Sequence, residues 1–254
     1  ANVPYITDLA NFITVPYNPV PLDAGTAGVV NGAYALYNGG IQQAFAYLVA
    51  VSPMTQEMAD AEIAKRTISF AAGQNAVVIM DEDLTDLTAI NPGLISMRQA
   101  TADDLLLLAS SAFIGTLADP NNPGSINGVA VPLGDQWVLT PQEQLVIQVA
   151  TDSYNATMAA IAGSNPNIAL FDFYNLGVEA VSGIVFDDYT MNGKLVTGGI
   201  FSLDGVHTTA RGYALIANYV LAAMDVEFGS NFSTATNGLA KAGDFPTNYS
   251  AMLR

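Results

Sequence analysis

Asp204 and His207 are the residues of this sequence whose types and spacing best fit catalytic chemistry. His207 is the only histidine among 254 residues, and it follows Asp204 by three positions on a glycine-containing loop. A carboxylate at this spacing can turn back to the imidazole Nδ1, which fixes the tautomer and leaves Nε2 free to take a proton. The pair predicts the base and the orienting acid of a Ser-His-Asp triad. The alternative is a histidine that caps a helix or fills a polar niche.

The residues after His207 predict the helix that holds this loop in place. Thr208 or Thr209 is a suitable N-cap, because its hydroxyl can accept a hydrogen bond from an amide of the first turn. Apolar residues then recur at helical spacing as far as Met224. The loop is therefore expected to sit at the N-terminal end of a packed helix.

The stretch Leu203-Asp204-Gly-Val-His207-Thr-Thr-x-x-Gly212-Tyr-x-x-Ile-Ala217 resembles the last sequence block of the SGNH, or GDSL-type, hydrolase family. Family members usually have proline after the histidine, and Thr208 occupies that position here. The resemblance implies a carboxylic ester hydrolase in which His207 is the general base and then the acid. Asp204 would orient the imidazole and stabilise its protonated form.

Three further stretches, 14–22, 72–79 and 125–141, are similar to the C-terminal portion of large secreted or lipoprotein SGNH hydrolases of Bacteroidetes. The resemblance implies an α/β, three-layer flavodoxin-like SGNH fold, of which 1–254 is the C-terminal part of a single domain. Residues 18–135 would be a large insertion with helices and a hairpin that shapes the pocket. It also implies an extracytoplasmic place, either secreted or attached to the outer-membrane surface, and an ester substrate that is a lipid or an acylated carbohydrate.

The nucleophile of the expected triad is missing from the sequence, which contains no Gly-Asp-Ser, no Gly-x-Ser-x-Gly and no convincing Gly-x-Asn-Asp. The resemblance implies that the serine and the oxyanion donors come from a segment before Ala1. We expect a processed, cleaved or truncated chain that is inactive alone, because it starts without Met or a signal sequence. The serines considered as substitutes lie in no strand-to-helix elbow, and Ser202 is expected to be structural: Ser110, Ser111, Ser125 and Ser202.

Composition excludes several classes of protein. The formal charge is −16, with 23 acidic and 7 scattered basic residues, so a nucleic-acid partner is not expected. The absence of cysteine excludes disulfides and thiolate chemistry, and a single histidine makes a catalytic zinc site unexpected. We predict no cofactor, no metal and no transmembrane segment.

Two other functions remain open at this point. One is a non-catalytic binding or structural subunit of a cell-surface assembly that retains the fold. The other is a calcium-stabilised carbohydrate binder that uses Asp81, Asp83 and Asp86.

Periodicity and turn residues predict the remaining elements. Thr140-Pro-Gln-Glu143 is a capping box, so a helix should begin there and run to about residue 162. The other expected helices are 27–51, interrupted or kinked at 38–40, then 55–66, 100–108 and 176–182. The expected strands are a hairpin of 67–70 with 76–80, a buried strand at 168–173, and a hairpin of 185–189 with 194–197 around Asn192-Gly193.

Overall fold

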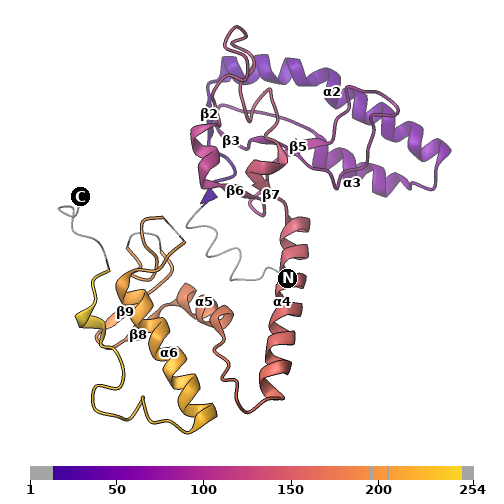
Figure 1. The fold of residues 1–254 in the computed structure, drawn as a ribbon. Coiled ribbons are helices and arrows are strands. Elements are labelled where there is room, and N and C mark those ends of the chain that lie inside the picture. The colour runs from indigo at the N-terminus through magenta and orange to yellow at the C-terminus, as the bar shows by residue number, and fades with distance from the viewer. Residues whose placement is uncertain (1–13, 195–196, 205, 248–254) are drawn as a thin grey trace. The chain divides into compact units, whose positions relative to one another are not determined.

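The computed structural model describes residues 14–194, 197–204 and 206–247. Their contacts divide into two compact units, which we describe separately (Figure 1). The N-terminal unit is Thr14–Gln144, and the C-terminal unit is the described part of the chain from Leu145 onward. The expected insertion at 18–135 falls within the N-terminal unit.

The protein mixes helices with small antiparallel sheets, which agrees with the α/β class in its broad sense. In the N-terminal unit, the helices are α2 (Ala24–Val51) and α3 (Gln56–Arg66), and α4 (Pro141–Gly163) begins at its end. Its strands are β1 (Thr14–Val15), β2 (Val20–Leu22), β3 (Gly73–Asn75), β4 (Val78–Met80), β5 (Met97–Gln99), β6 (Leu105–Leu107) and β7 (Val138–Leu139), with 3-10 turns η1 (Leu108–Ala112) and η2 (Asp135–Trp137). They form one three-stranded sheet, β1-β6-β7, and the pairs β2-β3 and β4-β5.

The C-terminal unit contains most of α4, followed by α5 (Phe173–Ser182) and α6 (Ala210–Phe228). A single hairpin joins β8 (Ile184–Phe186) to β9 (Tyr189–Met191), and η3 is a short turn at Ala242–Asp244. A small apolar cluster from α5, the hairpin and α6 forms its core. Within the described ranges, no helix has both the length and the hydropathy required to cross a bilayer.

Local capping signals predicted the starts of α3 and α4 correctly. Thr55 caps α3 by accepting a hydrogen bond from the amide of Met58 at 3.2 Å. The capping box before α4 is confirmed, because the Thr140 amide and hydroxyl both donate to Glu143 Oε2, at 2.7 and 2.8 Å. The region around Asn38 does not interrupt its helix, and α2 is one element of 28 residues.

The predicted hairpin of 67–70 with 76–80 is wrong, because side chains of α2 replace one of its strands. Asn38 donates from Nδ2 to the carbonyl of Ile68 at 2.8 Å and accepts from its amide at 3.0 Å. Asn31, seven residues earlier on the same face of α2, binds the amide and carbonyl of Phe70 in the same way. Two asparagine side chains therefore satisfy the backbone of 68–70 as a neighbouring strand would.

The predicted helix at 100–108 is also wrong. Asp104 Oδ2 accepts hydrogen bonds from the amide and hydroxyl of Thr101, at 2.7 and 2.9 Å, and so forms a turn. Residues 105–107 continue as β6, which pairs with both β1 and β7. The apolar pattern was compatible with a helix, but the pairing of 105–107 with β1 and β7 makes this segment a strand.

Two predictions fail in the C-terminal unit. Residues 168–172 form no ladder within the described chain, although a helix follows as expected at α5. The hairpin lies earlier than predicted, with its turn at Asp187-Asp188, and Asp187 adopts a φ of 52° that suits this turn. The expected second strand at 194–197 lies partly outside the described residues.

Tyr34 on α2 is a buried group whose ionisation is linked to folding. Its hydroxyl donates to the carbonyl of Val129 at 2.6 Å, and burial, with a smaller contribution from Tyr37, raises the pKa of Tyr34 to about 12. In the unfolded chain the phenol loses its proton near pH 10. Between these values the unfolded state binds fewer protons, so stability falls as the pH rises.

We expect the free energy of unfolding to decrease above pH 10, and less steeply in Tyr34→Phe. Each fully linked proton contributes about 1.4 kcal/mol per pH unit. Urea unfolding between pH 9 and 11.5 measures this slope. Tyr154→Phe, which alters an exposed tyrosine of α4, serves as the control and should keep the wild-type slope. Equal slopes in Tyr34→Phe and wild type would contradict the linkage.

Candidate functional site

The loop that carries Asp204 and His207 is closed at its base by backbone hydrogen bonds. The amide of Ser202 donates to the carbonyl of His207, and the amide of Thr209 donates to the carbonyl of Ile200, both at 2.8 Å. Phe201 and Thr208 form an antiparallel bridge between the two sides. Residue 205 lies outside the described residues. Asp204 and His207 are therefore held on a short closed loop directly before α6.

Thr209 attaches this loop to α6, as one of the two N-cap predictions required. Its hydroxyl accepts from the amide of Gly212 at 3.0 Å and donates to the carbonyl of Gly199 at 2.6 Å. Gly212 lies so close to the loop that a Cβ there would stand 2.6 Å from the carbonyl oxygen of Ile200. The glycine of the sequence block thus allows the helix start and the strand-like base of the loop to approach each other.

Asp204 accepts hydrogen bonds on both carboxylate oxygens. Oδ1 accepts from the hydroxyl of Ser202 at 2.8 Å and from the amides of Val206 and His207, at 3.0 and 2.9 Å. Oδ2 lies 2.7 Å from His207 Nδ1. The Val206 amide, then the His207 ring and the Ser202 hydroxyl, hold the pKa of Asp204 well below its ordinary value. Asp204 is therefore an anion across the whole neutral range.

His207 is oriented by this carboxylate, and its other ring nitrogen is left open. The 2.7 Å contact to Asp204 favours the tautomer with a proton on Nδ1, so Nε2 carries the lone pair. Within the described chain, Nε2 has no hydrogen-bond partner, and the side chain is 71% exposed. The arrangement can accept a proton from a group that approaches Nε2.

The serines considered as nucleophiles do not occupy that position. Ser202 donates to Asp204, which makes it a support of the carboxylate, as expected of a structural residue. Ser125 donates to the carbonyls of Asp119 and Asn122, and Ser111 to the carbonyl of Leu108. Ser110 is buried with no hydrogen-bond partner in the described chain. None of the described serine hydroxyls is hydrogen-bonded to His207.

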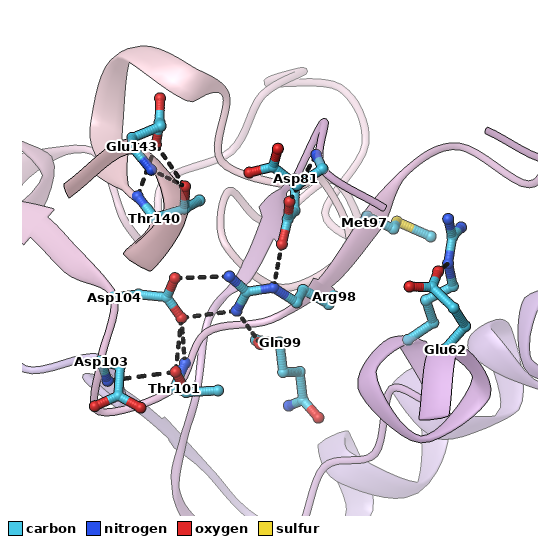
Figure 2. Close-up of polar contacts among 12 residues, drawn as sticks. Glu62, Asp81, Met97, Arg98, Gln99, Thr101, Asp103, Asp104, Thr140 and Glu143 are labelled. Carbon is cyan, nitrogen blue, oxygen red and sulfur yellow. Dashed lines mark hydrogen bonds and ion pairs between the residues drawn. The ribbon is translucent and has the colours of Figure 1, made fainter. Parts of the chain in front are cut away.

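A second polar cluster, centred on Arg98 of β5, lies in the N-terminal unit (Figure 2). Its Nη1 and Nη2 donate to the two oxygens of Asp104, both at 2.7 Å, and its Nε donates to Asp81. These three residues are at most 7% exposed. Because all three guanidinium nitrogens already donate to protein acceptors, we interpret this cluster as a structural ion network. The sequence analysis did not predict this network. The feature that could have indicated it is Arg98, one of only seven basic residues, within a largely apolar segment.

The acidic segment considered for calcium does not gather its carboxylates. Asp81 is paired with Arg98, and Asp86 accepts from the amide and hydroxyl of Thr88. In the described part of the chain, the one group of acidic oxygens close enough for a cation comprises Glu82, Asp135 and Glu143, within 4.8 Å of one another. The negative charge of Asp135 is the largest cause that raises the pKa of Glu82. The calcium alternative based on Asp81, Asp83 and Asp86 therefore has no geometric support.

Comparison with known proteins adds no relative. The chain matches no protein-family model, no curated protein and no solved structure. The geometry of Asp204 and His207 therefore carries the functional interpretation by itself.

Proposed function

We propose that this chain supplies the Asp-His half of a Ser-His-Asp triad in an SGNH-type hydrolase of carboxylic esters. The observation that carries the proposal is the 2.7 Å contact between Asp204 Oδ2 and His207 Nδ1, with Nε2 open to an incoming group. A carboxylate that only capped the loop would need its amide contacts but not this contact to the imidazole. Three hydrogen bonds to the other oxygen keep the carboxylate in place for that role.

In this proposal His207 moves one proton in each half of the reaction. The serine hydroxyl oxygen attacks the ester carbonyl while Nε2 takes the hydroxyl proton. Nε2 then gives that proton to the departing alkoxide. Water next attacks the acyl-enzyme, loses a proton to Nε2, and the serine recovers it as the acid leaves. Asp204 stays ionised throughout and stabilises the imidazolium, which its lowered pKa permits.

The serine and the oxyanion donors would come from another polypeptide segment that covers the C-terminal unit. On α4, only Gln148 and Ala162 are buried, whereas Val146, Tyr154 and Met158 are at least 50% exposed. Apolar helical faces of this kind are normally covered. The amides of residues 169–172 also have no partner in the described chain. Unpaired backbone of this kind is suited to pair with an added strand.

The three-layer flavodoxin-like arrangement is part of the same proposal. Residues 168–172 would become a strand of a parallel sheet once the covering segment pairs with them, and α4, α5 and α6 would lie on its faces. An extracytoplasmic protein, secreted or attached to the outer-membrane surface, is also proposed, because the chain contains no cysteine and shows the resemblance described above. The substrate would be a lipid or acylated carbohydrate ester.

A non-catalytic binding or structural subunit is the second candidate. The observation that favours it is that Ser202, a serine with its hydroxyl hydrogen-bonded to the dyad, is used to hold Asp204. In that case the exposed apolar face of α4 would bind a structural partner, and the dyad would only stabilise the loop.

The proposal is tested on native material by intact mass, N-terminal sequencing and labelling with a fluorophosphonate. We expect a serine-bearing polypeptide with a Gly-Asp-Ser block to accompany this chain and to take the label, and we expect hydrolysis of p-nitrophenyl esters. Purified 1–254 should be inactive and unlabelled. If no such polypeptide is present and no activity is found, the second candidate is favoured. Hydrolysis by 1–254 alone that His207→Ala abolishes would contradict an external serine.

A further inference from the structure

An apolar cavity of about 200 Å³ lies beside His207 in the C-terminal unit. Its deepest side chains come from α5, α6 and the base of the loop and are at most 6% exposed: Leu176, Ala180, Ile200 and Leu215. Phe173 and Val206, which are 53% and 72% exposed, belong to its outer part. Every lining residue except Thr208 is either apolar or glycine. The cavity is therefore suited to a hydrocarbon group rather than to a polar one.

The residues on both sides of His207 in the sequence, Val206 and Thr208, are part of the cavity wall. They flank His207 in the sequence, while the imidazole itself is exposed and is not part of the wall. Leu215 and Gly212 continue the wall along the first turns of α6, below the loop. The cavity is thus built from the same elements that position the dyad.

Thr208 is the single polar side chain of the wall, and it is not satisfied. The residue is 7% exposed, and its Oγ1 is buried with no hydrogen-bond partner in the described chain. A buried hydroxyl without a partner is costly. Rotation about χ1 places the hydroxyl in another of the three staggered positions on Cβ, from which it can donate to an acceptor oxygen at the wall. An ester provides such an oxygen next to its hydrocarbon chain.

We propose that this cavity binds the hydrocarbon chain of the ester substrate, with the Thr208 hydroxyl donating to an ester oxygen. A cavity of 150 Å³ with similar lining holds benzene, so about 200 Å³ accommodates roughly six to eight carbon atoms. The inference rests on the proposed function, since it is the esterase reaction that brings an ester to His207. It assigns specificity to Leu176, Ala180, Ile200 and Leu215 and excludes long, rigid or highly polar groups from this position.

The test measures binding of small esters to the full 254-residue chain, monitored through the methyl NMR signals of Ile200, Leu215 and Val206. The probes are methyl acetate, butanoate, hexanoate and octanoate, together with the matching alkyl acetates. Each added methylene should tighten binding by about fourfold until the cavity is full. The series with the steeper chain-length dependence identifies whether the acyl or the alcohol chain enters. Absence of saturable shifts at these methyl groups with methyl hexanoate and hexyl acetate would overturn the proposal.

Two variants make the result specific. Ala180→Leu fills the deepest part of the cavity and should abolish the chain-length dependence, with folding checked on the amide spectrum. Thr208→Val keeps the shape, and it should weaken binding of the preferred ester roughly fivefold while leaving binding of toluene unchanged. A Thr208→Val variant that binds both probes like wild type would contradict the role of the hydroxyl. Unlike Ala180→Leu, this variant adds no volume to the core.

His207→Ala separates this inference from the esterase proposal. Because the ring of His207 is exposed and is not part of the cavity wall, the variant should bind the probes within about twofold of wild type. Binding that persists in native material without esterase activity would overturn the catalytic proposal and leave the cavity as a hydrocarbon-binding site. Esterase activity without chain-length-dependent binding would overturn the cavity inference instead.

Discussion

His207→Ala is expected to lower kcat for p-nitrophenyl ester hydrolysis by roughly 10⁴- to 10⁶-fold in the enzyme assembled with its serine-bearing segment. Without the imidazole, no group in the described chain is placed to take the proton of the serine. The 2.7 Å contact from Asp204 and the open Nε2 are the physical reason. The measurement is steady-state hydrolysis at equal, known concentrations of the assembled wild-type and variant proteins. A variant that retained a tenth of the wild-type kcat would contradict the role of His207 as base.

Variants of Asp204 distinguish orientation from simple charge. In Asp204→Asn the amide can donate to Nδ1, which moves the ring proton to Nε2 and removes the base, so a loss of about 10⁴-fold in kcat is expected. Asp188→Asn is the matched control. It removes the same charge from an exposed residue of the same unit and should leave kcat unchanged. Ser202→Ala removes one of the hydrogen bonds that hold the carboxylate, so its loss should be far smaller.

Asp104→Ala is expected to lower the free energy of unfolding by about 3–5 kcal/mol. It removes both hydrogen bonds from Asp104 to the Arg98 guanidinium and leaves a buried cation whose one remaining acidic partner in the described chain is Asp81 (Figure 2). It also removes the acceptor that forms the turn at Thr101. Urea denaturation followed by circular dichroism measures the difference.

Asp103→Ala is the control for this experiment, because Asp103 is the exposed neighbour of Asp104 and its carboxylate makes no ion pair in the described chain. It should change stability by less than about 0.5 kcal/mol. A cost for Asp104→Ala as small as that for Asp103→Ala would show that the ion network does not stabilise the unit. Replacement of Arg98, Asp81 and Asp104 together by Met and Leu should recover much of the loss, because no unpaired charge then remains buried.

The candidate site was largely predictable because its geometry is local. Asp204 and His207 are three residues apart, so a single turn of the chain brings the carboxylate to Nδ1. Thr209 was one of two residues expected to cap α6, and Gly212 belongs to the sequence block that carried the resemblance. The buried hydroxyl of Thr208 and the cavity beside it could not be read from the sequence. They depend on how α5 and α6 pack around Ile200. No short-range sequence pattern places these three parts of the chain together.

The sequence by itself determined the local features of this protein: the caps at Thr55, Thr140 and Thr209, the dyad at Asp204 and His207, and the acidic charge balance. Only the tertiary structure decided which segments pair. Asn31 and Asn38 took the place of a strand beside 68–70, and β6 formed where helical spacing had been read. The physical reason is range: a cap or a three-residue turn is closed by neighbouring groups. Strand partners and the ion network of Arg98 are instead chosen by residues far along the chain that compete for the same backbone and charged groups.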